Sequence, residues 1–375
     1  MKLKIFSLLI LLILIIFTVN PMTSFAETIS SKELNIKTLG AIGDGVTDDT
    51  QAIQNIIDNS NDYDHIYIPV GKYKVSQLEI NGKHNLKISG EGTLIKDSNA
   101  TVYATIYIHS SNHITIEDLN MVGANTGGAD RGIWAVDNYA LKIQNINFTN
   151  FSQQAMMLWG GNSAEEFTNR IQNNYISKCG YGIQTIANAE YYAITQNTIT
   201  QCTYGIHGAL GNDRIDNNQI TNNVYGIWLD GAINSNADHS SIANNQINHN
   251  KAIGLYLANV HLSESIIDNE ILSTVGPEVW DVTGYNYSLV IVNCKNLVFT
   301  SNQIDGGNDG SIYIDGNAGC RWIGNTLHGD LKEVSKSGKN VYNGNVFTDG
   351  FKLLLHPDTP QPVRTGDIEN CEYVN

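Results

Sequence analysis

The chain has 375 residues, of which 16% are charged, 34 are glycine and only 6 are proline. Its net charge of −15 at pH 7 argues against nucleic acid as a partner, because phosphate binding needs a basic face. Short alternating apolar runs separated by small polar residues favour β-strands over amphipathic helices. We therefore expect an all-β protein.

Residues 1–26 have the three parts of a secretory signal peptide. Lys2 and Lys4 precede an apolar run, and the small residues Ser24 and Ala26 stand just before Glu27. The apolar run is shorter than the roughly 20 residues that cross a bilayer. We predict export and cleavage, with a secreted protein and no membrane anchor left afterwards. Loss of the two lysines leaves 20 of the 22 basic residues against 37 acidic ones, a net charge of −17.

Residues 27–95 are predicted to form an N-terminal cap and the first coils of the domain. Thr47 or Asp48 can cap a helix. The apolar face of that helix would consist of Ala52, Ile53, Ile56 and Ile57. We expect the helix to cover the open N-terminal end of the domain, and we assign Asp44, Asp48 and Asp49 to this local structure rather than to a metal site.

Residues 96–350 consist of a repeated segment. Cys179-Gly-Tyr-Gly-Ile, Cys202-Thr-Tyr-Gly-Ile and Asn223-Val-Tyr-Gly-Ile recur along the chain. The repeat glycines, 21 to 28 residues apart when Ala155 is counted in one slot, are Gly132, Gly182, Gly205, Gly226 and Gly254. Steps of this size fit one turn of a solenoid.

An asparagine also recurs two residues before an apolar residue in successive repeats. These asparagines are Asn174, Asn197, Asn218, Asn245, Asn269, Asn302, Asn325 and Asn345. Period two places each asparagine and its apolar partner on the same inward side of a strand, where stacked amides can bind one another. The pattern predicts a right-handed parallel β-helix, with residues 351–375 as an irregular C-terminal cap or tail.

Cys179 and Cys202 occupy the same slot on successive repeats. Adjacent coils are close enough for a disulfide, but side chains in register point the same way, which favours free thiols. No cysteine and histidine spacing is typical of a zinc site.

The stretch from Leu39 to Asp58 reads Leu-Gly-Ala-Ile-Gly-Asp-Gly-Val-Thr-Asp-Asp-Thr-Gln-Ala-Ile-Gln-Asn-Ile-Ile-Asp, and Ile66-Tyr-Ile-Pro-Val-Gly-Lys-Tyr-Lys-Val follows it. This signature resembles the N-terminal part of the pectate-lyase superfamily of β-helices. That group includes polysaccharide lyases, polygalacturonase-like hydrolases, mannuronan C5-epimerases and phage tailspikes. The resemblance implies the fold and says little about the reaction. Because elongated members often self-associate, it also leaves room for a homotrimer.

The strand after each repeat glycine alternates inward and outward, which defines two outward columns. The first column is Trp134, Met157, Gln184, His207, Trp228 and Tyr256. The second column is Val136, Trp159, Ile186, Ala209, Asp230 and Ala258. After an apparent insertion at residues 284–293, a further coil would add Tyr313 and Asp315. Outward aromatic rings suit sugar faces, although loops or a trimer interface are alternative covers for them.

His207 and Asp230 lie on successive coils in neighbouring outward columns. We expect their side chains to meet and Asp230 to raise the pKa of His207. The placement is similar to that of the catalytic acids and histidine of mannuronan C5-epimerases. Their Asp-Pro-His run is absent here, with Gln184 or His207 standing in the Asp slot.

β-Elimination from a uronate needs a base for the C5 proton, a neutraliser for the carboxylate and an acid for the leaving oxygen. His207 is the candidate base and Tyr256 the candidate acid. Arg131 is a candidate neutraliser, and calcium is an alternative one with Asp213 or Asp216 as ligands. No other metal or cofactor is predicted.

Two alternatives to a lyase stay open. Hydrolysis needs two carboxyl groups, and the candidates are Asp230 with Asp137, Asp213 or Asp238. A non-catalytic glycan-binding or matrix protein is the other, because a fold does not fix a function. The sequence favours an enzyme that processes a polysaccharide, with catalytic residues His207, Asp230 and Tyr256. The predicted substrate-binding residues are Trp134, Trp159, Gln184, Trp228 and Arg131.

Overall fold

The computed structural model describes residues 31–126, 130–160, 169–209, 211–233, 239–260, 265–273, 286–306, 310–317, 319–348, 351–360, 362–366 and 372–374. The predicted signal peptide and Asp238 lie outside the described residues. Within them, no helix is both long and apolar enough to cross a membrane.

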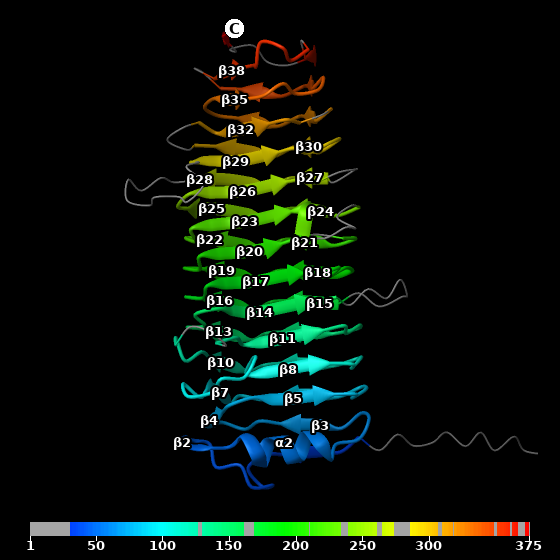
Figure 1. Ribbon diagram of the computed structural model, residues 1–375, viewed down its shortest axis with the longest axis vertical. Helices are drawn as coiled ribbons and strands as arrows, with labels where there is room; N and C mark the ends of the chain where they lie inside the picture. Colours follow the sequence, from blue (N-terminus) through cyan, green and yellow to red (C-terminus); the bar gives the residue numbers. More distant parts are fainter. Residues whose placement is uncertain are drawn as a thin grey trace, which may run out of the picture. The chain divides into compact units, whose positions relative to one another are not determined.

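The described residues from 32 onward form coils of short strands, and successive coils pair in parallel to build three long sheets (Figure 1). Sheet A contains β1 (Glu33–Asn35), β3 (His65–Tyr67), β6 (Lys87–Ser89), β9 (Thr115–Glu117), β12 (Lys142–Gln144), β15 (Asn169–Gln172), β18 (Tyr192–Thr195), β21 (Arg214–Asp216), β24 (Ser241–Ala243), β27 (Ser265–Ile267), β30 (Val298–Thr300), β33 (Arg321–Ile323), β36 (Val341–Asn343) and β39 (Val363–Thr365). Sheet B contains β2 (Asp44–Asp48), β4 (Lys72–Val75), β7 (Thr93–Lys96), β10 (Asn120–Val122), β13 (Asn147–Thr149), β16 (Tyr175–Ser177), β19 (Thr198–Thr200), β22 (Gln219–Thr221), β25 (Gln246–Asn250), β28 (Glu270–Ser273), β31 (Gln303–Asp305), β34 (Thr326–Leu327) and β37 (Val346–Phe347).

Sheet C carries the outward columns. Its strands are β5 (Leu78–Asn81), β8 (Ile106–His109), β11 (Ile133–Val136), β14 (Gln154–Trp159), β17 (Tyr181–Ile186), β20 (Tyr204–Gly208), β23 (Tyr225–Asp230), β26 (Ile253–Ala258), β29 (Tyr287–Val292), β32 (Ile312–Asp315), β35 (Leu331–Glu333), β38 (Lys352–Leu354) and β40 (Glu372–Val374). A short 3-10 helix, η1 (Gly231–Ile233), follows β23. The predicted parallel β-helix is confirmed.

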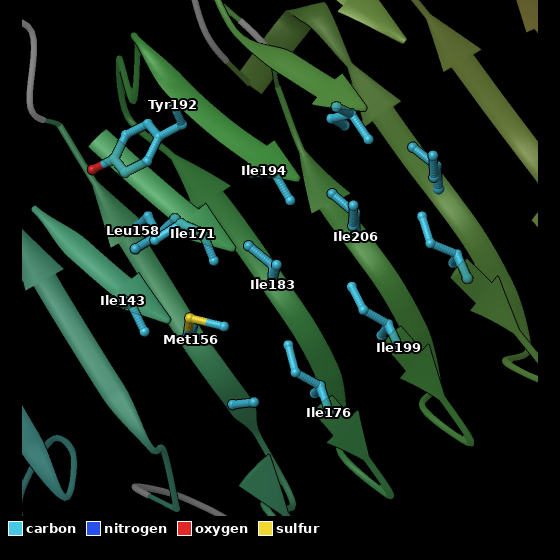
Figure 2. Close-up of a cluster of buried hydrophobic side chains, with 14 of the residues drawn as sticks. Ile143, Met156, Leu158, Ile171, Ile176, Ile183, Tyr192, Ile194, Ile199 and Ile206 are labelled. Atoms are coloured by element: carbon cyan, nitrogen blue, oxygen red, sulfur yellow. The ribbon is translucent and has the colours of Figure 1, made fainter. Parts of the chain in front are cut away.

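The interior is filled by inward-facing aliphatic side chains stacked from coil to coil. Ile143, Ile171 and Ile194 occupy matching positions on β12, β15 and β18, and all three are buried (Figure 2). Ile183 and Ile206 do the same on sheet C. Burying such columns removes apolar surface from water along the whole stack, at roughly 25 cal/mol per Å².

The repeat glycines are required by a close approach between coils. A Cβ added to Gly205 would lie 2.5 Å from the carbonyl oxygen of Gly226 and 2.7 Å from the Ile220 side chain. A Cβ added to Gly226 would lie 2.4 Å from the carbonyl oxygen of Gly254. A larger residue at Gly205 or Gly226 would therefore require the neighbouring backbone to shift.

The predicted asparagine ladder is confirmed. Asn245 illustrates it: its Oδ1 accepts from the Asn218 main-chain N–H and side-chain amide, both at 2.9 Å. Its own amide donates to Asn269 Oδ1 and to the Ile215 carbonyl oxygen, both at 3.0 Å. The amide is buried with its hydrogen bonds satisfied, which removes the cost of taking it out of water.

Helix α2 (Thr50–Asp58) lies at the N-terminal end of this stack (Figure 1). It buries Ile53, Ile56 and Ile57, as the pattern predicted. The N-cap residue is Asp49, and its carboxylate binds the main-chain N–H groups of Ile42 and Gly43 instead of the helix. Of the two predicted caps, Asp48 accepts a hydrogen bond from the main-chain N–H of Thr50, the first residue of the helix, at 2.9 Å. The acidic residues of this segment thus hold the local chain, as expected.

Cys179 and Cys202 are buried free thiols, as predicted. A hydrogen bond between the two thiols, together with burial, raises the pKa of Cys179. They lie at the corner where the chain passes from sheet B to sheet C.

One feature of sheet C differs from the sequence interpretation. Residues 287–292, treated there as part of an insertion, form β29 and make a complete step of the sheet. Val290 therefore stands between Tyr256 and Tyr313 in the outward column. The slot of the repeat glycine is occupied by Ser288 in this strand.

Candidate functional site

The first outward column exists as predicted. Cross-strand pairing aligns Trp134, Met157, Gln184, His207, Trp228 and Tyr256 on β11, β14, β17, β20, β23 and β26. It also extends to Tyr107 on β8, which the sequence analysis missed. In the second column Val136, Trp159 and Ile186 are paired, and so are Asp230 and Ala258. Strand β20 ends at Gly208, so the second column is interrupted before Asp230.

The outward aromatic rings are less exposed than the column pattern suggested. Only Trp159, at 40%, is exposed among the predicted sugar-binding tryptophans. Trp134, Trp228 and Tyr256 are half-buried. Neighbouring aromatic side chains cover part of these rings.

Four aromatic residues gather near the start of sheet C, and we call them the N-terminal aromatic cluster: Tyr103, Tyr107, Trp134 and Trp159. The Trp134 ring centroid lies 4.9 Å from that of Tyr103 and 6.2 Å from that of Trp159. Arg131 places its guanidinium carbon 5.8 Å from the Trp134 ring centroid, within cation–π range. Tyr103 and Trp159 keep exposed ring surface at this cluster.

His207 lies in a second aromatic environment, three coils further on. The rings of Tyr181 and Tyr204 meet its imidazole edge to face, with centroids at 5.2 and 4.9 Å. Tyr204 in turn stacks between Tyr181 and Tyr225, at 4.9 and 4.7 Å. These tyrosines belong to the repeated Tyr-Gly-Ile motif, so the motif itself could have been used to predict that they lie side by side on successive coils.

The expected rise in the pKa of His207 is wrong in direction. Burial lowers this pKa to about 4, because the packed surroundings penalise the charged imidazolium. The negative charge of Asp230 acts in the opposite sense and is the weaker of the two effects. His207 is therefore neutral at pH 7.

Asp230 lies near His207 but is held by other groups. Its Oδ1 accepts hydrogen bonds from the main-chain N–H of Ala232 at 2.9 Å and from the side-chain amide of Asn259 at 2.8 Å. Among the described residues no hydrogen bond or ion pair joins Asp230 to His207. Asp230 is near enough for its charge to act on His207, as expected, but the two side chains do not form the expected direct contact.

Tyr256 packs against Trp228 on the adjacent coil. The two rings are stacked, with centroids 3.7 Å apart and planes 13° apart. Trp228 also meets Tyr204 and Tyr225 edge to face, at 5.9 and 5.1 Å. Trp228 thus packs between Tyr204, which contacts His207, and Tyr256. Part of the Trp228 ring surface is covered by these contacts.

A line of hydrogen-bonded side chains runs across the coils on this face, and we call it the outer ladder: Arg131, Gln154, Gln184 and His207. Arg131 Nε donates to Gln154 Oε1 at 2.6 Å, and Gln154 Nε2 donates to Gln184 Oε1 at 2.7 Å. Gln184 Nε2 lies 3.3 Å from His207 Nδ1. Burial lowers the pKa of Arg131, which still carries its charge at neutral pH.

A hollow of about 780 Å³ lies beside the repeat tyrosines, at the corner between sheets B and C. Its polar lining includes Asn125, Lys178, Gln201, Asn222 and Lys251. Two lysines on one hollow give a local positive charge on an otherwise acidic protein. The sequence analysis did not single them out, because the corner residues vary from one repeat to the next.

Two of the carboxylates that the sequence offered for calcium or for hydrolysis have structural roles. Asp213 is buried and accepts from the main-chain N–H groups of Tyr192 and Gly211, at 2.6 and 3.2 Å. Asp216 accepts from the Asn244 amide at 3.0 Å on sheet A. Within the described ranges, no group of three histidine, cysteine or acidic residues is placed to hold a metal ion.

Two family models match the chain. Residues 34–114 match rhamnogalacturonase A/epimerase, pectate lyase-like, and residues 131–283 match the right-handed β-helix region. Mannuronan C5-epimerase AlgE2 of Azotobacter vinelandii is 35% identical over 115 residues. That match covers 26% of this chain but only 12% of the relative, so the chain corresponds to a small part of that protein.

Solved structures share the fold. The A-module of mannuronan C-5 epimerase AlgE4 from Azotobacter vinelandii superimposes with a TM-score of 0.55 and 13% identity, covering 91% of this chain and 97% of that one. DFA-IIIase from Arthrobacter chlorophenolicus A6 without its lid gives a TM-score of 0.56 and 16% identity, covering 86% and 92%. At these identities the likeness establishes the architecture and not the reaction.

Proposed function

We propose that this right-handed parallel β-helix protein, which matches the two family models over residues 34–114 and 131–283, is a secreted enzyme that processes a polysaccharide along the outer face of sheet C. One observation carries this proposal. A neutral, half-buried histidine lies in the middle of a face whose aromatic residues extend over several coils in both directions.

An extended chain of sugars suits this face better than a small ligand. The N-terminal aromatic cluster and the His207 region are three coils apart, or about 14 Å at the usual strand spacing. Exposed rings at Tyr103 and Trp159 offer flat apolar surface for sugar faces. The relatives AlgE2 and AlgE4 are named for mannuronan, which is consistent with a polysaccharide substrate.

We propose β-elimination from an acidic polysaccharide as the reaction. His207, Asp230 and Tyr256 bring an imidazole, a carboxylate and a phenol to adjacent coils, and this reaction requires proton transfer on both sides of the bond that breaks. The substrate carboxylates would be attracted by Lys178 and Lys251 at the hollow and by Arg131 further along. Which group removes the proton depends on where the imidazole carries its hydrogen.

Hydrolysis has less support from the site. It needs two carboxyl groups facing one glycosidic bond. Within β14, β17, β20, β23 and β26, Asp230 is the one acidic residue. A non-catalytic binding role would use the same aromatic face without His207.

The test incubates the chain without residues 1–26 with a panel of acidic and neutral polysaccharides. Ultraviolet absorbance of unsaturated ends and release of reducing ends are followed together. His207→Asn is the test variant, and His249→Asn is the matched control because His249 is an exposed histidine on β25 of sheet B. We expect absorbance for the unmodified chain and for His249→Asn, with at least a hundredfold loss in His207→Asn.

Other outcomes would redirect the proposal. Reducing ends without absorbance would establish hydrolysis and move attention to Asp230. Binding without product, unchanged in His207→Asn, would establish a glycan-binding protein. Repeating the panel with a chelator and with added calcium tests whether calcium serves as the neutraliser, and light scattering on the same sample tests whether the chain forms a homotrimer.

A further inference from the structure

In the outer ladder each side chain donates a hydrogen bond to the next one, and Arg131 at one end fixes this donor-to-acceptor order. A guanidinium group only donates hydrogen bonds, so Gln154 must turn its carbonyl oxygen toward Arg131 Nε, 2.6 Å away. Its amide nitrogen then faces Gln184 and requires an acceptor there, which is Gln184 Oε1 at 2.7 Å. The amide orientation of both glutamines, which is often ambiguous, follows here from the chemistry of Arg131.

The same direction reaches His207. With its oxygen committed to Gln154, Gln184 presents its amide nitrogen to His207 Nδ1 at 3.3 Å. An amide nitrogen is a donor only, so Nδ1 must accept and cannot carry a hydrogen. A neutral imidazole has one N–H, and it must then be on Nε2, the ring nitrogen further from the main chain.

Within the described part of the chain, the other neighbours of His207 meet it through aromatic rings or act on it through charge. The rings of Tyr181 on β17 and Tyr204 on β20 meet the imidazole through their faces and edges. Asp230 on β23 contributes its charge, and its Oδ1 is held by Ala232 and Asn259. Gln184 thus makes the polar contact to Nδ1 that sets the tautomer.

We propose that Arg131 is a positioning residue that acts through Gln154 and Gln184 to fix His207 in the Nε2–H tautomer, so that His207 offers substrate a hydrogen-bond donor rather than a base. The donor role rests on the proposed function; the tautomer does not. In this state Nε2–H can stabilise an anionic oxygen of the sugar, and the nearest carboxylate available to take a proton is Asp230. The sequence-based assignment of His207 as the base is thereby replaced.

Nuclear magnetic resonance of the chain labelled with ¹⁵N-histidine tests the tautomer without any substrate. Long-range ¹H–¹⁵N spectra at pH 7 distinguish a ring nitrogen that carries hydrogen from one that does not, and the signal missing from His207→Asn identifies His207. We expect Nε2 to carry the hydrogen in the unmodified chain. We expect Arg131→Met and Gln154→Leu to shift His207 toward a mixture of the two tautomers.

Gln184→Glu is the sharpest variant, because a carboxylate accepts where the amide donated. We expect it to place a hydrogen on Nδ1 and to raise the pKa of His207 from about 4 to above the ordinary value. Arg170→Met and Gln172→Leu, both on β15 of sheet A, are matched controls that should leave the His207 signals unchanged. Preserved signals of the other histidines would show that each variant is folded.

Two results would overturn the inference. One is a hydrogen on Nδ1 of His207 at pH 7 in the unmodified chain. The other is an unchanged tautomer in Arg131→Met, Gln154→Leu and Gln184→Glu when all three are folded. A chain that shows the expected spectra but processes no polysaccharide would retain the tautomer assignment and lose the enzymatic proposal, so the two failures are distinguishable.

Discussion

Two side-chain ladders of the β-helix differ in their residues: one runs inside the coils and one runs along the outside of sheet C. The inner ladder repeats a single residue type from Asn174 to Asn345. The side chain of Asn245, for example, has its donors and its acceptor hydrogen-bonded. The outer ladder has four members of three types, and it begins with a cation and ends on an imidazole. A uniform ladder holds coils together, whereas a ladder with different ends can transmit a hydrogen-bond direction to a reactive group.

A third ladder on the outside of sheet B completes the comparison. Gln219 donates to Gln246 at 3.0 Å, and Gln246 donates to Glu270 at 3.3 Å. Gln219 and Gln246 are exposed to water, which competes for the same hydrogen bonds. Asn245 and Gln246 are adjacent in the chain and face opposite sides of the coil, so they form a matched pair for experiment.

The largest effect is expected from Asn245→Ala. The substitution leaves the main-chain N–H and the amide of Asn218, and the Ile215 carbonyl oxygen, without their buried partner. Three such groups cost about 4 kcal/mol of unfolding free energy in total. Urea unfolding monitored by circular dichroism measures it. A loss below about 1 kcal/mol would mean that water replaces the missing amide and that the inner ladder contributes little.

A smaller effect on the unfolding free energy is expected from lowering the pH, because His207 at the end of the outer ladder has a lowered pKa. The folded pKa of His207 is about 4 and its unfolded value about 6.5, so the unfolded chain takes up a proton first as the pH falls. The contribution is complete above pH 6.5 and is lost as the pH drops toward 4. At pH 4.5 this costs about 2 kcal/mol relative to pH 7.

Urea unfolding at the two pH values, in the unmodified chain and in His207→Asn, isolates that contribution from the other titrating groups. We expect the variant to lose less stability on acidification. An identical loss in both proteins would show that His207 titrates normally in the folded state.

The smallest effect is expected from Gln246→Ala on the exposed ladder. Its hydrogen bonds are replaced by water, so the unfolding free energy should change by less than about 0.5 kcal/mol. The same urea experiment measures it beside Asn245→Ala. A cost comparable to that of Asn245→Ala would contradict the distinction between buried and exposed ladders.

The sequence predicted the regular parts of the fold because each depends on a short period. The repeat glycines and the inward asparagines recur once per coil, and stacking coils in register converts that period into contact. The outward column from Trp134 to Tyr256 followed from the same register. The prediction failed for residues 287–292, which form a complete step of sheet C.

The site was less predictable, for a geometric reason. Gln154 pairs with Tyr181 and lies in a different column from Gln184, so its hydrogen bond to Gln184 runs diagonally across the sheet. The repeat period predicts which residues pair directly between coils, but it does not predict diagonal contacts. The predicted direction of the His207 pKa shift was also wrong, because the shift depends on how closely Tyr181 and Tyr204 pack on the imidazole.

By itself, the sequence determined the parallel β-helix, its inward ladder and the coils on which His207, Asp230 and Tyr256 lie. These follow from spacing along one chain, which the period of the coil converts directly into position. Only the tertiary structure decided which neighbours bury His207, that Asp230 is held by Ala232 and Asn259, and that a line from Arg131 ends on Nδ1. Burial and hydrogen-bond direction are properties of several coils at once, so no single repeat of the sequence contains them.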